Sequence, residues 1–360
     1  MKQKLNFREI QEQREKEWLS PRAALAAESN QRLYPEKESD FRTCFQTDCD
    51  RILYSKAFRR LMHKTQVFIA PEGDHYRTRL THTLEVSQIS RNISRVLNLN
   101  EDLTESVALG HDLGHSPFGH AGELALNQLL QTFAPGERFL HQEHSLRVVD
   151  LLEQPGGLNL TLKTRDGILC HSKGRATLSG HEEPDNPKLP VSLEGQVVRI
   201  ADRMAYLNHD LDDALRAGII KENRLPKGVV KLLGNSTSKR ITNMINDVIK
   251  NSRESKTIRM SKDFATASEE LKEFLWDNVY IDSAAKQEEA KSQKMLGFLF
   301  HHFMDHPELI PKIFFSATGS KPEDPVQRAR AVCDYIAGMS DRYALFLFER
   351  IFVPKFWQHT

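Results

Sequence analysis

The helical spacing of its apolar residues is the feature of this sequence that most limits its fold. From Asp50 onward, apolar residues recur three and four positions apart, as in Ile52, Ala57 and Leu61. This spacing gives a helix one buried face. Runs that alternate apolar and polar residues, as strands do, are nearly absent apart from short stretches such as 65–69. The pattern predicts an all-α fold.

Three regions are expected along the chain: an N-terminal arm at 1–49, a core at 50–220 and a C-terminal helical region at 221–360. The last would pack on the core or on neighbouring subunits. The arm is polar and charge-rich, with a helical patch at 21–29. Residues 172–192 are rich in Gly, Pro, Ser and charge, and we expect them to form a long loop beside the candidate functional site described below. The helices expected after the first part of the core span 103–109, 121–132, 143–152, 194–217, 229–250, 268–278, 290–302, 325–338 and 341–351.

Composition limits the class of protein mainly by what is missing. The net charge is +1, from 50 basic and 49 acidic residues, so charge gives no support for nucleic-acid or membrane partners. The four cysteines are scattered, and Cys44 and Cys49 have no matching second pair, so a zinc ribbon is not expected. The N-terminus has no apolar stretch of the kind found in signal peptides. No stretch approaches the roughly 18 apolar residues that a membrane helix needs. These features predict a reduced, cytoplasmic protein.

An adjacent histidine–aspartate pair, His111-Asp112, lies among small and turn-forming residues in the run GHDLGHSPFGHAGE. Upstream, His82 shares a helical face with apolar neighbours and should point inward, while Asp202 lies in the expected helix 194–217. A single buried histidine is usually an ordinary core residue. Imidazoles and carboxylates from three separated segments, taken together, suit a hard or borderline divalent ion that keeps positions open for water and substrate.

Three stretches resemble the HD-domain deoxynucleoside triphosphate triphosphohydrolases, and most closely the bacterial dGTPase-like group. They are TRLTHTLEV (78–86), GHDLGHSPFGHAGE (110–123) and LEGQVVRIADRMAYLNHDLDDA (193–214). FRRLMHKTQVF (58–68) and IAGMSDRYAL (336–345) are similar too, so the resemblance covers roughly residues 40–350. The bare HD signature is common to many phosphohydrolases, whereas the GHAGE and AYLNHD extensions are specific. The resemblance implies an HD-domain helical core with additional C-terminal helices.

The resemblance also implies an activity and a role for individual residues. A dNTP would be cleaved at the α-phosphorus to a deoxynucleoside and inorganic triphosphate. The implied ligands of a divalent metal (Mn, Mg, Fe, Co, Ni or Zn) are His82, His111, Asp112 and Asp202. The implied phosphate and catalytic pocket contains His115, His120, Glu123 and His141, with His120 in proton transfer. The implied substrate contacts are Gln66 to the 3′-hydroxyl, Arg79 to phosphate, and Tyr206 and Asp210 to phosphate and sugar.

Alternatives stay open for several residues. Glu123 could be a helix first-turn carboxylate near the dipole, and Gln66 could cap a turn near Pro71. His144 is expected on a helix surface, and His171 could approach the site. The basic residues Lys56, Arg59, Arg60 and Lys64 could hold phosphates or form a helix face.

Alternatives also stay open for the activity. One is an HD phosphohydrolase of another nucleotide, such as a nucleoside monophosphate or an alarmone. Another is a non-catalytic nucleotide-binding regulator, against which stands the presence of all four implied ligands with His120 and Glu123. The resemblance suggests a homo-oligomer, and it leaves open whether a nucleotide activator is needed.

Overall fold

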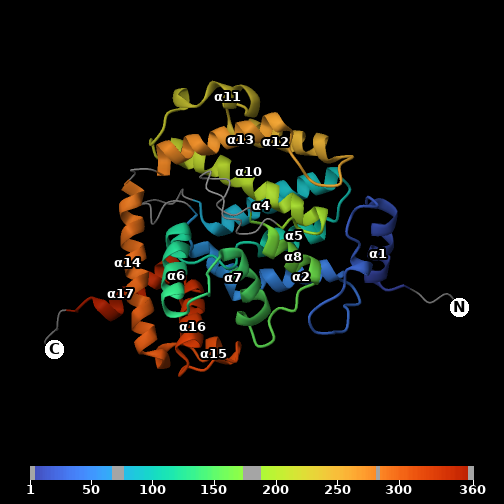
Figure 1. Cartoon of the computed structure of the whole chain (residues 1–360). Helices are drawn as coiled ribbons and strands as arrows, with labels where there is room; N and C mark the ends of the chain where they lie inside the picture. The colour runs from blue at the N-terminus through green and yellow to red at the C-terminus, as the bar shows by residue number, and fades with distance from the viewer. Residues whose placement is uncertain (1–4, 67–76, 173–187, 281–283, 356–360) are drawn as a thin grey trace, which may run out of the picture.

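The computed structural model describes residues 5–66, 77–172, 188–280 and 284–355 of the chain. Throughout these ranges the regular structure is helical (Figure 1). The β-pairings found there are two isolated bridges, Arg32 with Thr161 and Thr65 with Thr78. The prediction of an all-α fold is confirmed.

The helices divide into three groups along the chain. The first contains α1 (Phe7–Trp18), α2 (Cys44–Leu53), α3 (Lys56–Arg60), α4 (Arg79–Val96) and α5 (Glu101–Gly110). The second contains α6 (Gly119–Phe133), α7 (His141–Arg147), α8 (Leu162–Cys170) and α10 (Leu193–Arg216). The third contains α11 (Lys227–Leu233), α12 (Thr237–Ser252), α13 (Lys262–Leu275), α14 (Ala284–Asp305), α15 (Ile313–Ser316), α16 (Pro325–Ala337) and α17 (Asp341–Phe352).

The largest apolar core forms where α4, α5 and α10 pack against one another (Figure 1). Val86 of α4, Val107 of α5 and Val197 of α10 are fully buried in it. Burying one such side chain stabilises the fold by about 1.5–3 kcal/mol. Since α12 and α13 cover the outer side of α10 with their apolar faces, and α11 packs on those two helices, α10 is buried along most of its length.

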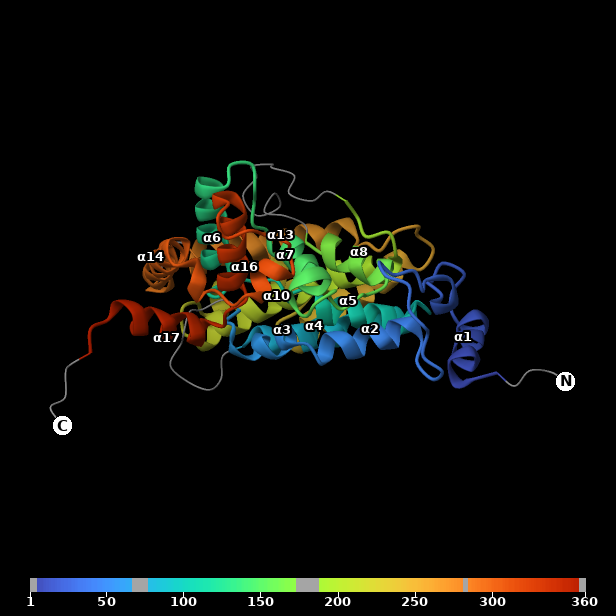
Figure 2. The same cartoon turned by 90° about the horizontal axis from the view of Figure 1, so that it is seen from below.

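A second core joins the C-terminal helices to the middle of the chain. Leu126 of α6, Phe300 of α14 and Val332 of α16 are buried in it. Figure 2 shows α6 and α16 beside each other, with α14 next to them and α1 at the opposite end of the molecule. The C-terminal helices therefore share a core with α6, the helix that begins at Gly119.

Two sequence predictions about helices were wrong. The predicted helix 229–250 is two helices, because Gly234 takes φ 121°, a conformation that favours glycine, and Ser236 then caps α12. In the arm, residues 21–29 hold only a short 3₁₀ turn at Ala26–Glu28, whereas α1 forms a full helix at 7–18. The signal for α1 was a capping box, in which Asn6 and Glu9 bond to each other's backbone N–H.

Candidate metal and phosphohydrolase site

Three core helices bring the predicted metal-binding residues together. His82 lies on the buried face of α4, and Asp202 lies on α10. Helix α5 ends at Gly110, so that His111 and Asp112 follow directly at its C-terminal end. Because α4, α5 and α10 pack against one another, four residues from distant parts of the sequence converge.

Gly110 allows the end of α5 to lie close to its neighbours. A Cβ atom at this position would be 2.5 Å from Cδ1 of Ile168 and 3.3 Å from Cδ1 of Ile52. Real Cβ atoms do not approach other carbons as closely as 2.5 Å, so a larger residue would force the Ile168 side chain of α8 to shift. The glycine that precedes the histidine–aspartate pair therefore has a packing role that sets where the pair lies.

The nitrogen and oxygen atoms of the cluster lie within a few ångströms of one another. Nε2 of His82 is 3.1 Å from Oδ1 of Asp202. Nε2 of His111 is 3.3 Å from Oδ1 of Asp112 and 3.8 Å from Oδ1 of Asp202. One ligand atom from each of His82, His111 and Asp112 falls within a 4.8 Å group. Asp202 Oδ1 thus contacts both imidazoles of that group.

His111 is arranged as a metal ligand would be. Its Nδ1 lies 2.6 Å from the carbonyl oxygen of Ala108, which accepts the ring N–H and leaves the Nε2 lone pair free. Nε2 is buried and makes no hydrogen bond within the described part of the chain. A buried polar atom without a partner costs about 1–3 kcal/mol. Two imidazole nitrogens and two carboxylates suit a divalent ion, so the residues present fit such a group.

Electrostatics keep both carboxylates of the cluster charged. Burial opposes ionisation of Asp112, but nearby His111 and His115 hold its pKa well below the usual range. Burial also opposes ionisation of Asp202, but the hydrogen bond with His82 lowers the pKa of this carboxyl. Both groups are therefore anionic at neutral pH, the form that binds a cation.

A second group of site residues lies beside the first. The rings of His115 and His141 stack with centroids 4.1 Å apart, and Nε2 of His115 is 3.1 Å from Oδ1 of Asp112. Glu123 Oε1 accepts from the backbone N–H of His141 at 3.0 Å and lies 3.1 Å from its Nδ1. His115, Glu123 and His141 also satisfy the distances of a metal-binding group.

Glu123 connects this group to His120. Oε2 of Glu123 lies 3.5 Å from Nδ1 of His120, whose side chain is 57% exposed. Burial opposes ionisation of Glu123, but His141 and His120 hold its pKa well below the usual range. Glu123 therefore does more than interact with the dipole at the start of α6, because its carboxylate contacts both His120 and His141.

The predicted substrate-contacting residues lie in two places around the cluster. Arg79, at the start of α4, donates from Nη1 to Oδ2 of Asp112 at 3.0 Å. Its Nε and the Oε1 atom of Gln66 are both buried, and neither finds a hydrogen-bond partner among the residues described. The alternative that Gln66 caps a turn near Pro71 involves a residue outside the described ranges.

Tyr206 and Asp210 lie on α10 one and two turns after Asp202, the first half-buried and the second buried. Arg203, the residue after Asp202, forms an ion pair with Glu269 of α13. This contact turns Arg203 toward the C-terminal helices.

Two histidines have different outcomes from the sequence predictions. His171 approaches the site: its ring centroid is 5.0 Å from that of His111 and 5.3 Å from that of His141. Burial and the charges of His111 and His141 lower the pKa of His171 to about 3. The prediction that His144 is a surface residue was wrong. It is buried, and its Nδ1 lies 2.9 Å from the carbonyl oxygen of Gly114, because α7 is covered by the loop that follows His111-Asp112.

Two residues support the site from outside it, and the sequence gives no signal of this role for either. Lys64 is fully buried, and its Nζ donates to the carbonyl oxygens of His115 and Ala337. His209 places its Nδ1 3.4 Å from Nδ1 of His82, and its Nε2 contacts the Glu85 carboxylate. No sequence signal separates Lys64 from the basic residues near it, of which Lys56 and Arg59 are exposed. The helix-face alternative therefore holds for those two and not for Lys64.

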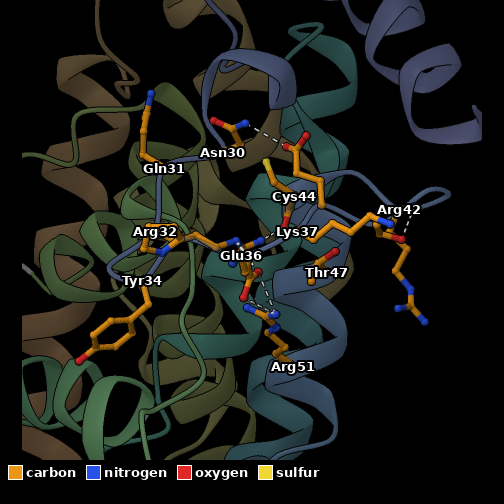
Figure 3. Close-up of a pocket in the computed structure, with 13 residues that line it drawn as sticks. Asn30, Gln31, Arg32, Tyr34, Glu36, Lys37, Arg42, Cys44, Thr47 and Arg51 are labelled. Carbon is orange, nitrogen blue, oxygen red and sulfur yellow. Dashed lines mark hydrogen bonds and ion pairs between the residues drawn. The ribbon is translucent and has the colours of Figure 1, made fainter. Parts of the chain in front are cut away.

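A pocket of about 460 Å³ lies elsewhere, between the 30–39 segment and α2 (Figure 3). Its arginines already have acidic partners: Arg32 and Arg51 both pair with Glu36, and Arg42 pairs with Asp50. None of the residues of the metal cluster lines it. The pocket is therefore separate from the candidate site.

The fold and the histidine–aspartate cluster define an HD-domain protein. The HD domain model matches residues 79–207, and a phosphohydrolase-associated domain matches residues 258–350. HD-domain phosphohydrolases depend on metal, in agreement with the cluster. Within the described residues, no helix is both long and apolar enough to cross a membrane.

Curated relatives make the family more specific. The chain is 51% identical to a deoxyguanosinetriphosphate triphosphohydrolase-like protein of Caldanaerobacter subterraneus subsp. tengcongensis, over 98% of each chain. Proteins of the same name from Desulfatibacillum aliphaticivorans and Clostridium perfringens are 47% and 43% identical, over 97% and 98% of this chain and 99% of each relative. The chain belongs to this family of deoxyguanosinetriphosphate triphosphohydrolase-like proteins and is a phosphohydrolase.

Proposed function

We propose that this protein is a metal-dependent dNTP triphosphohydrolase that releases a deoxynucleoside and inorganic triphosphate. The observation that carries the proposal is the convergence of a divalent-metal donor set with an arginine and a histidine–glutamate group in one place. The family name of the relatives points to the same substrate class.

In this proposal His82, His111, Asp112 and Asp202 hold the divalent ion. When bound, such an ion polarises a phosphate oxygen and lowers the pKa of a coordinated water. Arg79 stabilises charge on the phosphates, since its guanidinium is already directed at the cluster through Asp112.

The reaction needs a proton at the leaving oxygen. The oxygen of water bonds to the α-phosphorus while the bond from that phosphorus to the 5′ oxygen breaks, and the 5′ oxygen then takes a proton. His120 is proposed to deliver it, because its imidazole is exposed and paired with the Glu123 carboxylate. His115 and His141, stacked beside Asp112, line the same pocket.

Gln66, Tyr206 and Asp210 are proposed to contact the deoxyribose and the phosphates. The buried Oε1 of Gln66 has no hydrogen-bond partner in the described part of the chain, so a substrate hydroxyl would satisfy it. Tyr206 and Asp210 follow Asp202 at successive turns of α10, and this spacing places all three on one side of the helix.

A product assay tests the proposal. Purified protein is incubated with each dNTP, singly and mixed, in Mg²⁺, Mn²⁺ or Co²⁺, and the products are separated by HPLC. We expect deoxynucleoside and triphosphate in equal amounts. Turnover only in the mixture would indicate a nucleotide activator.

Other products would favour a different function. Hydrolysis of a nucleoside monophosphate or an alarmone without triphosphate release would indicate another HD phosphohydrolase. Binding of nucleotides with no turnover under any metal would indicate a regulator and would contradict the proposal.

We also propose that the chain forms a homo-oligomer through its C-terminal region. Phe298 of α14 is 56% exposed and its ring centroid lies 5.6 Å from that of Phe352 of α17, which is 37% exposed, so the two helices form a contiguous exposed aromatic patch. Light scattering after size exclusion gives the mass. A monomer at micromolar concentration would contradict this proposal.

A further inference from the structure

One carboxylate of the C-terminal region reaches two segments beside the candidate site. Asp341, the first residue of α17, accepts the backbone N–H of Phe118 at Oδ1, 2.9 Å away. Its Oδ2 accepts the backbone N–H of Thr65 at 2.9 Å and the Thr65 hydroxyl at 2.7 Å. These residues are 223 and 276 positions away in the sequence.

Both segments that Asp341 holds lead directly into residues of the proposed site. Thr65 precedes Gln66. Phe118 precedes Gly119, the first residue of α6, which is followed by His120. A shift of either backbone segment would therefore displace a side chain that we assign to substrate or to proton transfer.

The backbone at Phe118 needs an external support. Phe118 has φ 62°, a left-handed conformation that bulky residues rarely adopt, and it gives α6 no side-chain cap. Gly119 also has positive φ, and a Cβ there would lie 3.2 Å from Nη2 of Arg79 and 3.5 Å from the carbonyl oxygen of Gln66. The start of α6 thus lies against the backbone or side chain of two other site residues.

Asp341 is not required as the cap of its own helix. Ser340 caps α17 by accepting the backbone N–H of Tyr343. A second link joins the same regions, because Lys64, next to Thr65, donates to the carbonyl oxygens of His115 and Ala337. The hydrogen bonds of Asp341 are therefore directed at the site segments and are additional to those that form α17.

We propose that Asp341 is a positioning residue of the active site: by holding Thr65 and Phe118, it sets the relative placement of Gln66 and His120. The inference rests on the proposed function. It assigns to the phosphohydrolase-associated region, which matches residues 258–350, a direct part in forming the site.

Three variants test the proposal. Asp341→Asn removes the charge and one acceptor, while Thr65→Val removes only the hydroxyl donor. Ser340→Ala is the matched control, because it weakens the α17 cap and leaves all three Asp341 hydrogen bonds intact. Each protein is measured for metal content, thermal unfolding, kcat and KM for a dNTP, and amide hydrogen exchange in segments 61–66 and 115–122 without nucleotide.

We expect Asp341→Asn to lose on the order of 10²-fold in kcat, the effect of misplacing a catalytic group by about 1 Å. Metal content should stay at the wild-type level, and exchange should become faster in both segments. Thr65→Val should show a smaller loss of kcat. Ser340→Ala should unfold at a lower temperature yet keep the wild-type kcat and exchange rates.

Wild-type kcat in Asp341→Asn, or an equal loss of kcat in Ser340→Ala, would overturn the proposal. If Asp341→Asn does not fold, Thr65→Val decides, and a wild-type kcat in that variant overturns it. If the wild-type protein hydrolyses no dNTP, the proposed function fails on its own. Exchange then decides the positioning role, and unchanged rates at 115–122 in Asp341→Asn would overturn it.

Discussion

The side chains of the site differ in how far they are buried and in how many charged or polar partners they have. Asp112 is buried but contacts His111, His115 and Arg79, so its charge has partners on several sides. His120, in contrast, is mostly exposed and has one carboxylate partner, Glu123. An exposed imidazole can exchange protons with substrate and solvent, whereas the buried atoms around Asp112 are fixed in place. This contrast supports separate roles in proton transfer and in metal binding.

The first prediction follows from that contrast. His120→Ala should keep its metal but lose about 10²–10⁴-fold in kcat, the usual contribution of a general acid–base group. Elemental analysis and steady-state kinetics on the same preparation measure both quantities. A near wild-type kcat would move the role to His115 or His141, which stack 4.1 Å apart beside Glu123.

The second prediction concerns recognition of the sugar by Gln66. Its buried Oε1 has no hydrogen-bond partner within the described residues, and an unpaired buried amide costs roughly 1–3 kcal/mol. Gln66→Ala should therefore lower kcat/KM for dNTPs by about 5- to 150-fold. The comparison of dNTPs with 2′,3′-dideoxynucleotides measures the preference for the 3′-hydroxyl. Gln88→Ala, an exposed glutamine on α4, is the control.

The same preference for the 3′-hydroxyl in wild type and in Gln66→Ala would show that Gln66 does not read the sugar. A loss shared by Gln88→Ala would point to a general effect of removing a glutamine side chain and not to a contact with the sugar.

For single residues, the sequence predicts a role when the signal is local, and it fails when the role depends on contacts with residues far away along the chain. The His111-Asp112 pair could be found from its local motif, and its partners His82 and Asp202 could be found because each lies in a motif on a helix. Asp341 could not be found, because its importance comes from contacts with residues more than 200 positions away.

At the scale of elements, local periodicity predicted helices with a regular apolar face better than it predicted α1, which lacks one. The predicted ranges 103–109 and 194–217 agree with α5 and α10 to within two residues at each end. These helices have one or more buried faces, so their apolar spacing is regular. Helix α1 has a low apolar content and one buried residue, Glu12, so apolar spacing gave no signal there. Its capping box was the only local evidence.

The third prediction concerns the attachment of α1. Glu15 accepts the backbone N–H of Ala26 at 2.7 Å, and burial raises its pKa to about 7 from 4.5. Between these values the folded chain keeps a proton that the unfolded chain has lost, so this contribution to stability is present below pH 4.5 and is lost as the pH rises through 7. The unfolding temperature of Glu15→Gln relative to that of wild type should therefore rise when the pH is raised from 5 to 8.

Thermal unfolding at both pH values measures this change. The control is Glu17→Gln, which removes an exposed carboxylate from the same helix and should leave the pH dependence of wild type unchanged. If the unfolding temperature changes with pH by the same amount in wild type and in Glu15→Gln, the role of Glu15 is contradicted.

At the scale of the whole molecule, the site lies where separate packing units meet. The metal cluster is built on the α4–α5–α10 core, whereas His120 and Glu123 lie on α6, whose core includes α14 and α16. Polar contacts also join other segments near the site to α16: Arg147 of α7 donates to both oxygens of Asp334, and Lys64 donates to the carbonyl oxygen of Ala337. Such long-range contacts have no signature in a single sequence, which is why the C-terminal helices could be predicted but their contribution to the site could not.

The last prediction uses the metal as a link between parts of the fold. The four proposed ligands come from α4, from the end of α5 and from α10, so an ion bound by the folded chain stabilises all three against separation. Binding to the folded state alone adds about 2.7 kcal/mol of stability at a free metal concentration 100 times Kd. We expect chelation to lower the unfolding temperature of the wild-type protein and Mn²⁺ or Mg²⁺ to restore it. His111→Ala should lose bound metal, activity and this response together, whereas His301→Ala, which changes an exposed histidine on α14, should keep all three. A full metal complement in His111→Ala after chelation and reloading would show that the ion is held elsewhere.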